Sequence, residues 1–174
     1  FDARTAGAQW ATEGGTDRRP LLLLDGVGNP QNLGAIARTA AFFGLPRLVL
    51  SDHPGQALPS DAAYRISEGG LEHMDVYRSA GFARDLRALR EHYLVVGTAA
   101  QGGGAWPAAL GGPAHAGDQR PGALVLGNEE QGLPRATLAA CEAVVTIPGG
   151  GAVQSLNVAA TAAILLHAAV WRRR

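Results

Sequence analysis

The chain has 174 residues, with 15 acidic and 15 basic side chains, so its formal net charge at pH 7 is zero. Its length suits one domain with a hydrophobic core of its own, and it lacks the basic balance typical of many nucleic-acid-binding proteins. All the basic residues are arginines. The absence of lysine excludes lysine Schiff-base chemistry and the lysine-dependent phosphate-binding loop.

Cysteine and histidine usage limits the kinds of site that the chain can build. Cys141 is the only cysteine, which excludes an intrachain disulfide, and the five histidines form no zinc-binding pattern, so we predict no metal. No apolar run reaches the roughly 18 residues of a membrane span, and the N-terminus shows no basic segment followed by an apolar stretch. These features predict a soluble, cytoplasmic protein with no membrane partner.

Residues 1–19 are polar and show no clear period, so we expect a linker or the remnant of an N-terminal region. From residue 20 onward, apolar runs alternate with segments of helical period. Strands are expected at 21–24, 47–50, 93–96, 123–126 and 143–147. Helices are expected at 35–43, 82–91, 134–140 and 156–171, and the Gly- and Pro-rich segment 101–121 is expected to be a loop or a short irregular helix.

The alternation of strands and helices predicts an α/β fold, in which helices cover both faces of a mostly parallel sheet. Three glycine-rich loops, at 26–34, 127–132 and 148–151, each follow the end of a predicted strand. Open sheets of this kind bind ligands at the carboxyl ends of their strands. We therefore expect a ligand site formed by these loops.

Polar residues in the loops have simple local explanations when each loop is taken alone. Asn32 lies at or just before a helix start and suits a cap, and Arg38 suits a solvated helix face. Glu129 lies in a turn, where carboxylates are usually solvated. Ser155 suits a cap for the final helix, with Asn157 as a second polar group in its first turn.

Taken together, the three loops resemble the signature motifs of the SpoU (TrmH-like) family of RNA 2′-O-ribose methyltransferases, a branch of the SPOUT superfamily. The matching segments, in the family's order, are NLGAIARTA at 32–40, LGNEEQGL at 126–133 and IPGGGAVQSLNV at 147–158, with SEGGLEH at 67–73 between the first two. The resemblance covers about residues 21–170. The chain departs from it at Gly149, where many members have Met, and at Ala159, where a small hydroxyl residue is common.

The resemblance implies that residues 20–174 form a catalytic domain with a C-terminal deep trefoil knot, a rare exception to unthreaded folds. It also implies that S-adenosylmethionine binds in a bent form between the second and third loops. The expected cofactor-binding residues are Gly127, Ile147 and Leu156, with Gly97, Thr98, Leu126 and Pro148 at the same edge.

The implied reaction transfers a methyl group to a ribose 2′-hydroxyl, a poor nucleophile until its proton is withdrawn. In the family, the arginine at the position of Arg38 is proposed as the base. Arginine side chains normally have a pKa above about 12, so a phosphate clamp that orients the hydroxyl is the alternative role. Asn32, Glu129, Ser155 and Asn157 are expected to complete the catalytic site, and a purely structural role stays open for Ser155.

The resemblance further implies an RNA substrate, either ribosomal or transfer RNA, and segment 67–73 favours ribosomal RNA. Family members are generally homodimers, and the apolar helix over 159–170 suits a buried interface. Two alternatives stay open: a SPOUT enzyme that methylates a base nitrogen, and a non-catalytic module that binds RNA or cofactor.

Overall fold

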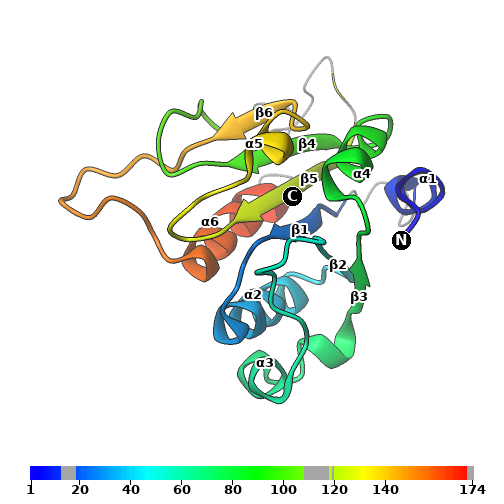
Figure 1. The fold of residues 1–174 in the computed structure, drawn as a ribbon, viewed down its shortest axis with the longest axis horizontal. Coiled ribbons are helices and arrows are strands. Elements are labelled where there is room, and N and C mark those ends of the chain that lie inside the picture. Colours follow the sequence, from blue (N-terminus) through cyan, green and yellow to red (C-terminus); the bar gives the residue numbers. More distant parts are fainter. Residues whose placement is uncertain (13–18, 108–117, 119, 172–174) are drawn as a thin grey trace.

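The computed structural model describes residues 1–12, 19–107, 118 and 120–171. Within these residues the chain forms one six-stranded sheet with the order β3-β2-β1-β5-β4-β6 (Figure 1), and every neighbouring pair is parallel. The strands are β1 (Leu21–Asp25), β2 (Arg47–Leu50), β3 (Asp75–Arg78), β4 (Leu94–Thr98), β5 (Gly122–Gly127) and β6 (Ala143–Val145).

The central strands are apolar because both faces of the sheet are covered. Every residue of β1 and β5 is buried, as expected for parallel strands between two helical layers. Asp25 at the end of β1 pairs in register with Gly127 at the end of β5. The loops that follow these two strands therefore leave the sheet at the same edge.

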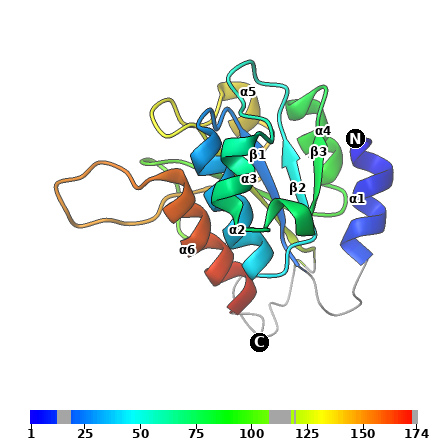
Figure 2. The same cartoon turned by 90° about the horizontal axis from the view of Figure 1, so that it is seen from below.

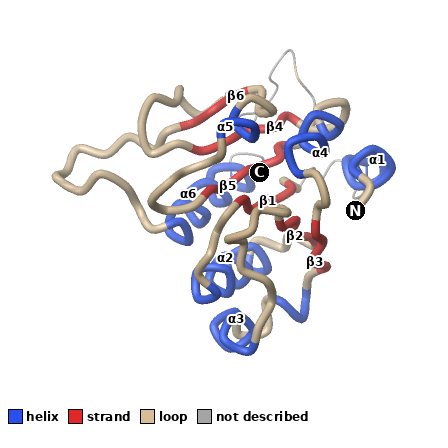
Figure 3. The backbone as a smooth tube through the Cα atoms, viewed as in Figure 1, coloured by secondary structure: helices blue, strands red, loops and turns tan. Residues whose placement is uncertain are grey.

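Helices lie on both sides of the sheet, as Figures 2 and 3 show. One face is covered by α2 (Pro30–Phe42) and α6 (Val158–Trp171), with α3 (Asp61–Ser67) and the 3-10 turn η1 (Leu71–His73) packed against α2. The opposite face is covered by α1 (Ala3–Thr12), α4 (Phe82–Leu89) and α5 (Arg135–Leu138). The predicted α/β fold is confirmed, and the trefoil knot stays a prediction.

Two helix starts differ from the sequence-based expectation. The cap of α2 is Asn29, whose Oδ1 accepts a hydrogen bond from the Gln31 N–H, so Asn32 lies inside the helix and the capping interpretation of Asn32 is wrong. The final helix begins at Val158, because the Asn157 Oδ1 accepts from the Ala159 N–H at 2.8 Å. Asn157, and not Ser155, therefore caps α6.

The N-terminal region contains a helix where the sequence showed no clear period. In α1, Ala3 is buried and Gly7 lies against α4, where an added Cβ would come within 3.0 Å of the Leu89 side chain. Trp10 contacts the ring of Tyr77 on β3, with ring centroids 4.9 Å apart. Residues 13–18 of the expected linker, and 108–117 and 119 of the expected loop, lie outside the described residues.

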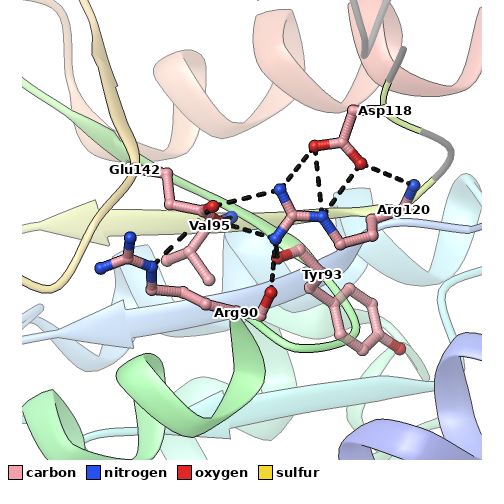
Figure 4. A network of polar contacts seen from close by, with 6 residues as sticks. All are labelled: Arg90, Tyr93, Val95, Asp118, Arg120 and Glu142. Atoms are coloured by element: carbon pink, nitrogen blue, oxygen red, sulfur yellow. Dashed lines mark hydrogen bonds and ion pairs between the residues drawn. The ribbon is translucent and has the colours of Figure 1, made fainter.

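A network of charged groups joins the starts of β4, β5 and β6, at the edge opposite the glycine-rich loops (Figure 4). The Arg120 guanidinium lies between Asp118 and Glu142 and also donates to the backbone carbonyl of Tyr93 at 3.2 Å. Glu142 in turn accepts from the backbone N–H of Val95 at 3.1 Å. The network joins the starts of three strands, two of which, β5 and β6, carry the second and third loops at their far ends.

Among the described residues, no helix is both long enough and apolar enough to cross a membrane.

Candidate active site

Asn32 joins all three glycine-rich loops through its side-chain amide. Its Nδ2 donates to Oε1 of Glu129 in the second loop, and its Oδ1 accepts from Nδ2 of Asn157 in the third at 3.1 Å. An amide carries one donor group and one acceptor, so a single side chain can hold a carboxylate on one side and an amide on the other. The structure thus brings together three of the predicted catalytic residues. Glu129 and Asn157 lie 97 and 125 positions after Asn32 in the sequence.

The second loop is a tight turn organised by Asn128, a residue that sequence reasoning did not assign. Its Oδ1 accepts from the backbone N–H groups of Glu130 and Gln131, and its Nδ2 donates to the carbonyl of Gly26 in the first loop. Gly127 admits no side chain, since a Cβ there would lie 2.7 Å from Leu133 N. The Asn after Gly127 in a turn was the available signal, because Asn side chains commonly bond backbone N–H groups two residues on.

Arg38 lies further along α2 and forms an ion pair with Glu68, which follows α3. Arg38 Nη1 donates to Glu68 Oε1 at 2.7 Å, and the two side chains are 57% and 62% exposed. Glu68 has φ 45° and ψ 51°, in the left-handed region that non-glycine residues rarely occupy. At Gly70 an added Cβ would lie 2.9 Å from the Cα of Arg38, so the turn after α3 presses directly on α2.

Sequence reasoning missed Glu68 as a partner of Arg38. The available signal was segment 67–73, in which a carboxylate precedes two glycines. In the structure this segment positions the Glu68 carboxylate beside the Arg38 guanidinium of the first motif.

The third loop, between β6 and α6, extends away from the sheet (Figure 1). Ser155 is exposed, and within the described part of the chain its side chain makes no hydrogen bond, so the structure does not bring it to Asn32 and Glu129. Val153 is 83% exposed and Leu156 is 48% exposed. The loop therefore presents uncovered apolar side chains close to the cap of α6.

The predicted cofactor residues lie where neighbouring strands end. Gly97 and Thr98 close β4, with Thr98 Oγ1 donating to the carbonyl of Val125 at 3.1 Å. Leu126 and Gly127 close β5, and Ile147 and Pro148 follow β6, with Ile147 packed against the core. Strand ends beside exposed apolar side chains such as Leu156 suit a ligand such as adenosine, which has both polar edges and apolar faces.

Cys141 is a poor candidate for a nucleophile. Burial raises the pKa of the Cys141 thiol to about 11, which disfavours the thiolate that nucleophilic chemistry requires. Its sulfur lies 2.9 Å from where a Cβ would stand on Gly97, on the face covered by α5. The described side chains include no group of three or more His, Cys, Asp or Glu residues placed to hold a metal ion.

Comparison with known proteins assigns this arrangement to a family. The model of the SpoU rRNA Methylase family matches residues 19–167. The chain belongs to this family. The match spans β1 to α6 and includes all three glycine-rich loops and the Asn32 cluster that joins them.

Individual SpoU relatives resemble the chain in sequence and in structure. The 23S rRNA (guanosine-2'-O-)-methyltransferase RlmB of Nitrosomonas europaea is 38% identical over 155 residues, which cover 88% of this chain and 56% of the relative. The solved structure of the SpoU methyltransferase AviRb from Streptomyces viridochromogenes, in complex with the cofactor AdoMet, has a TM-score of 0.73 at 29% identity and covers 90% of this chain and 58% of that one. A structure concerned with "the 2-OH methylation of C/U34 on tRNA" has a TM-score of 0.69 at 30% identity and covers 89% and 95% of the two chains.

The chain thus spans between 38% and 62% of the length of curated relatives such as this one. The family and the fold are shown over the matched region, and the solved SpoU structures confirm the predicted architecture.

Proposed function

We propose that this chain transfers the methyl group of S-adenosylmethionine to a ribose 2′-hydroxyl of RNA, with residues 20–174 as the catalytic domain. The observation that carries the proposal is the Asn32 amide, which joins Glu129 and Asn157 from two distant motif loops at the ligand-binding edge of the sheet. Membership of the SpoU family supports the reaction class. The names of the relatives, which specify 2′-O-methylation of ribosomal RNA and 2-OH methylation of tRNA, support the ribose as acceptor.

S-adenosylmethionine supplies an electrophilic methyl group on a sulfonium. The protein must bring the 2′-oxygen in line with this group and accommodate the proton that leaves the hydroxyl. Arg38 is exposed and carries its charge beside Glu68, so it can clamp an RNA phosphate while remaining paired on its other side. We assign Arg38 this clamping role, because a guanidinium matches the geometry of phosphate oxygens.

Asn32 acts as a positioning residue in this scheme. Its hydrogen bonds fix the Glu129 carboxylate and the start of α6, so the second and third loops keep a constant relation to α2. Glu129 then presents an acceptor for a ribose hydroxyl, and Ser155 in the third loop would orient the ribose. Gly97, Thr98, Leu126, Gly127, Ile147, Pro148 and Leu156 would hold the adenosine part.

The working unit that we propose is a homodimer in the cytoplasm, where ribosomal and transfer RNA are available. Helices α2 and α6 pack together, and each leaves a large apolar side chain exposed, Phe42 at 84% and Ile164 at 44%. A second copy packed on these two helices would cover both side chains.

The proposal is tested by methyl transfer from labelled S-adenosylmethionine to RNA transcribed without modifications. We expect incorporation by the wild-type protein, at least a hundredfold loss in Arg38→Ala, and little change in Arg65→Ala, which removes an exposed arginine from α3. Equal incorporation by the two variants would contradict the assignment of Arg38.

A further inference from the structure

An exposed strip of α2, formed by Gln31, Ala35 and Arg38, runs beside the Asn32 cluster. Gln31 and Arg38 are exposed and Ala35 is half-buried, and the three share one side of the helix because residues three and four apart face the same way. Figure 1 shows α2 lying between α6 and α3. The strip therefore has the start of α6 on one side and α3 on the other.

Packing contacts fix how α3 lies along α2. An added Cβ on Gly34 would lie 2.5 Å from the carbonyl oxygen of Ala63, so α3 touches α2 shortly after Asn32. Glu68, which follows α3, reaches Arg38 one turn further along α2. The residues between Ala63 and Glu68 therefore lie level with the stretch of α2 that runs from Gly34 to Arg38.

Tyr64 is the aromatic side chain of α3 that borders this strip. Residues four apart share one side of a helix, so Tyr64 lies on the flank of α3 that ends at Glu68 and faces Arg38. Its side chain is 42% exposed. Phe42, the other exposed Phe or Tyr ring among the described side chains, lies one turn beyond Arg38 and further from Asn32. Tyr64 is thus the exposed ring level with the catalytic stretch of α2.

Charge alone gives this surface little attraction for RNA. Residues 60–73 carry one arginine, Arg65, and three carboxylates, Asp61, Glu68 and Glu72. Arg38 is paired with one of these carboxylates, and the whole chain carries no net charge. Proteins that bind single-stranded RNA also gain affinity when bases stack on exposed aromatic rings, a contact that needs no net positive charge.

We propose that Tyr64 stacks on an unpaired base of the substrate RNA while Arg38 holds a phosphate of the same strand. The nucleotide to be methylated then lies over the strip, between Arg38 and Asn32, and the stacked base belongs to a near neighbour in the RNA. Tyr64 is a binding residue in this scheme and takes no part in the chemistry. The inference rests on the proposed function for its choice of RNA as the ligand.

The first test measures the affinity of the full chain for a fluorescently labelled single-stranded RNA of mixed sequence by anisotropy. We expect Tyr64→Ala to weaken binding about tenfold, within the range for one stacked base. Tyr64→Phe should bind as the wild type does, because it retains the ring, whereas Tyr64→Leu should bind nearly as weakly as Tyr64→Ala. Ile66→Ala is the matched control, since Ile66 is 39% exposed on the same helix but leaves it on nearly the opposite side.

Two further measurements separate stacking from charge. Tyr64→Ala should leave the salt dependence of RNA binding unchanged, whereas Arg38→Ala should reduce the slope of log K against log salt by about 0.7, the value for one phosphate contact to a single strand. An oligomer of the same length built from abasic units carries the phosphates without the bases. It should bind the wild type and Tyr64→Ala with equal affinity.

Three results would each overturn the proposal. The first is wild-type RNA affinity in Tyr64→Ala. The second is wild-type affinity in Tyr64→Leu, because an apolar contact would then suffice without an aromatic ring. The third is an equal loss of affinity for RNA and for the abasic oligomer in Tyr64→Ala, since the side chain would then act without a base.

The outcome is separable from the proposed function. In methyl transfer to the same RNA, Tyr64→Ala should raise the KM for RNA about tenfold and leave kcat and the KM for S-adenosylmethionine unchanged, as expected when only binding affinity is lost. Base stacking on Tyr64 without methyl transfer by the wild type would refute the enzymatic proposal alone. Methyl transfer with an unchanged KM for RNA in Tyr64→Ala would refute the stacking proposal alone.

Discussion

The guanidinium of Arg38 donates a 2.7 Å hydrogen bond to Glu68, and Glu68 occupies the left-handed backbone region at φ 45°. Non-glycine residues in that region are strained, and such strain is concentrated at functional sites. The pair is more than half exposed, so its contribution to folding is small. The pair instead orients the Arg38 side chain. Arg38 lies on α2, the helix that also carries Asn32.

Removing the Glu68 carboxylate should therefore lower methylation without destabilising the fold. We expect Glu68→Gln to reduce kcat about tenfold, because a clamp that loses its orientation misplaces the 2′-hydroxyl. The free energy of unfolding should change by less than about 1 kcal/mol, as for other exposed pairs. Glu72→Gln, an equivalent change at an exposed position of η1, is the control. Unchanged kcat in Glu68→Gln, measured with saturating RNA, would show that Arg38 needs no partner.

The two roles of Asn157 can be separated by substitution. Asn157→Ala removes both the cap of α6 and the bond to Asn32, so it should cost about 1 kcal/mol of stability and lower methylation. Asn157→Asp keeps a capping oxygen but loses the donor to Asn32. It should retain the melting temperature of the wild type while methylation falls as far as in the alanine variant. Wild-type turnover by Asn157→Asp would mean that the bond to Asn32 has no catalytic consequence.

The charged network at the opposite edge should govern stability alone. Arg120→Met removes hydrogen bonds to Asp118, Glu142 and the Tyr93 carbonyl, and we expect a loss of about 1–3 kcal/mol in urea denaturation. Arg87→Met on the exposed side of α4 is the control.

The effect should also depend on pH. Hydrogen bonds from the Arg120 guanidinium hold the pKa of Asp118 below its ordinary value of 3.8. A lowered carboxyl pKa stabilises the folded state above that ordinary value, and the contribution is lost as the pH falls through the lowered pKa. The difference between wild type and Arg120→Met should therefore shrink below about pH 4. A difference that stays constant down to pH 2 would exclude the ion pair as its cause.

The exposed apolar surface of α2 and α6 predicts self-association. Ile164→Glu places a charge at a position that is 44% exposed, where a monomer would tolerate it and a dimer interface would not. We expect a dimeric mass for the wild type in light scattering at micromolar concentration and a monomeric mass for the variant. A monomeric wild-type protein would exclude the dimer. A variant that remains dimeric would place the interface elsewhere.

Much of the architecture could be predicted because most of the strands are short apolar runs, and the two central ones, β1 and β5, end at Asp25 and Gly127. The run at residues 21–24 becomes β1, and the final apolar segment becomes α6. The edge strand β3, with the sequence DVYR and no fully buried residue, offers no such run and was not predicted. The helix α1 was missed because its buried positions, Ala3 and Gly7, are small and give little periodic signal.

The site was predicted from motif resemblance rather than from local chemistry. Local rules gave Asn32 a capping role that belongs to Asn29, and gave Ser155 the cap that Asn157 forms. These rules describe contacts within a few residues, whereas Asn32 reaches Glu129 and Asn157 across most of the chain. The partner of Arg38 could not be inferred either, since Glu68 is oriented by a backbone conformation that its residue type does not favour.

The most direct test of the central claim identifies the methylated atom. The protein is incubated with labelled S-adenosylmethionine and unmodified RNA, the RNA is digested to nucleosides, and the labelled product is analysed by mass spectrometry, with Arg38→Ala alongside. We predict a labelled 2′-O-methyl nucleoside that is absent from the variant. A labelled base with an unmodified ribose would contradict the account, as would labelling that persists undiminished in Arg38→Ala.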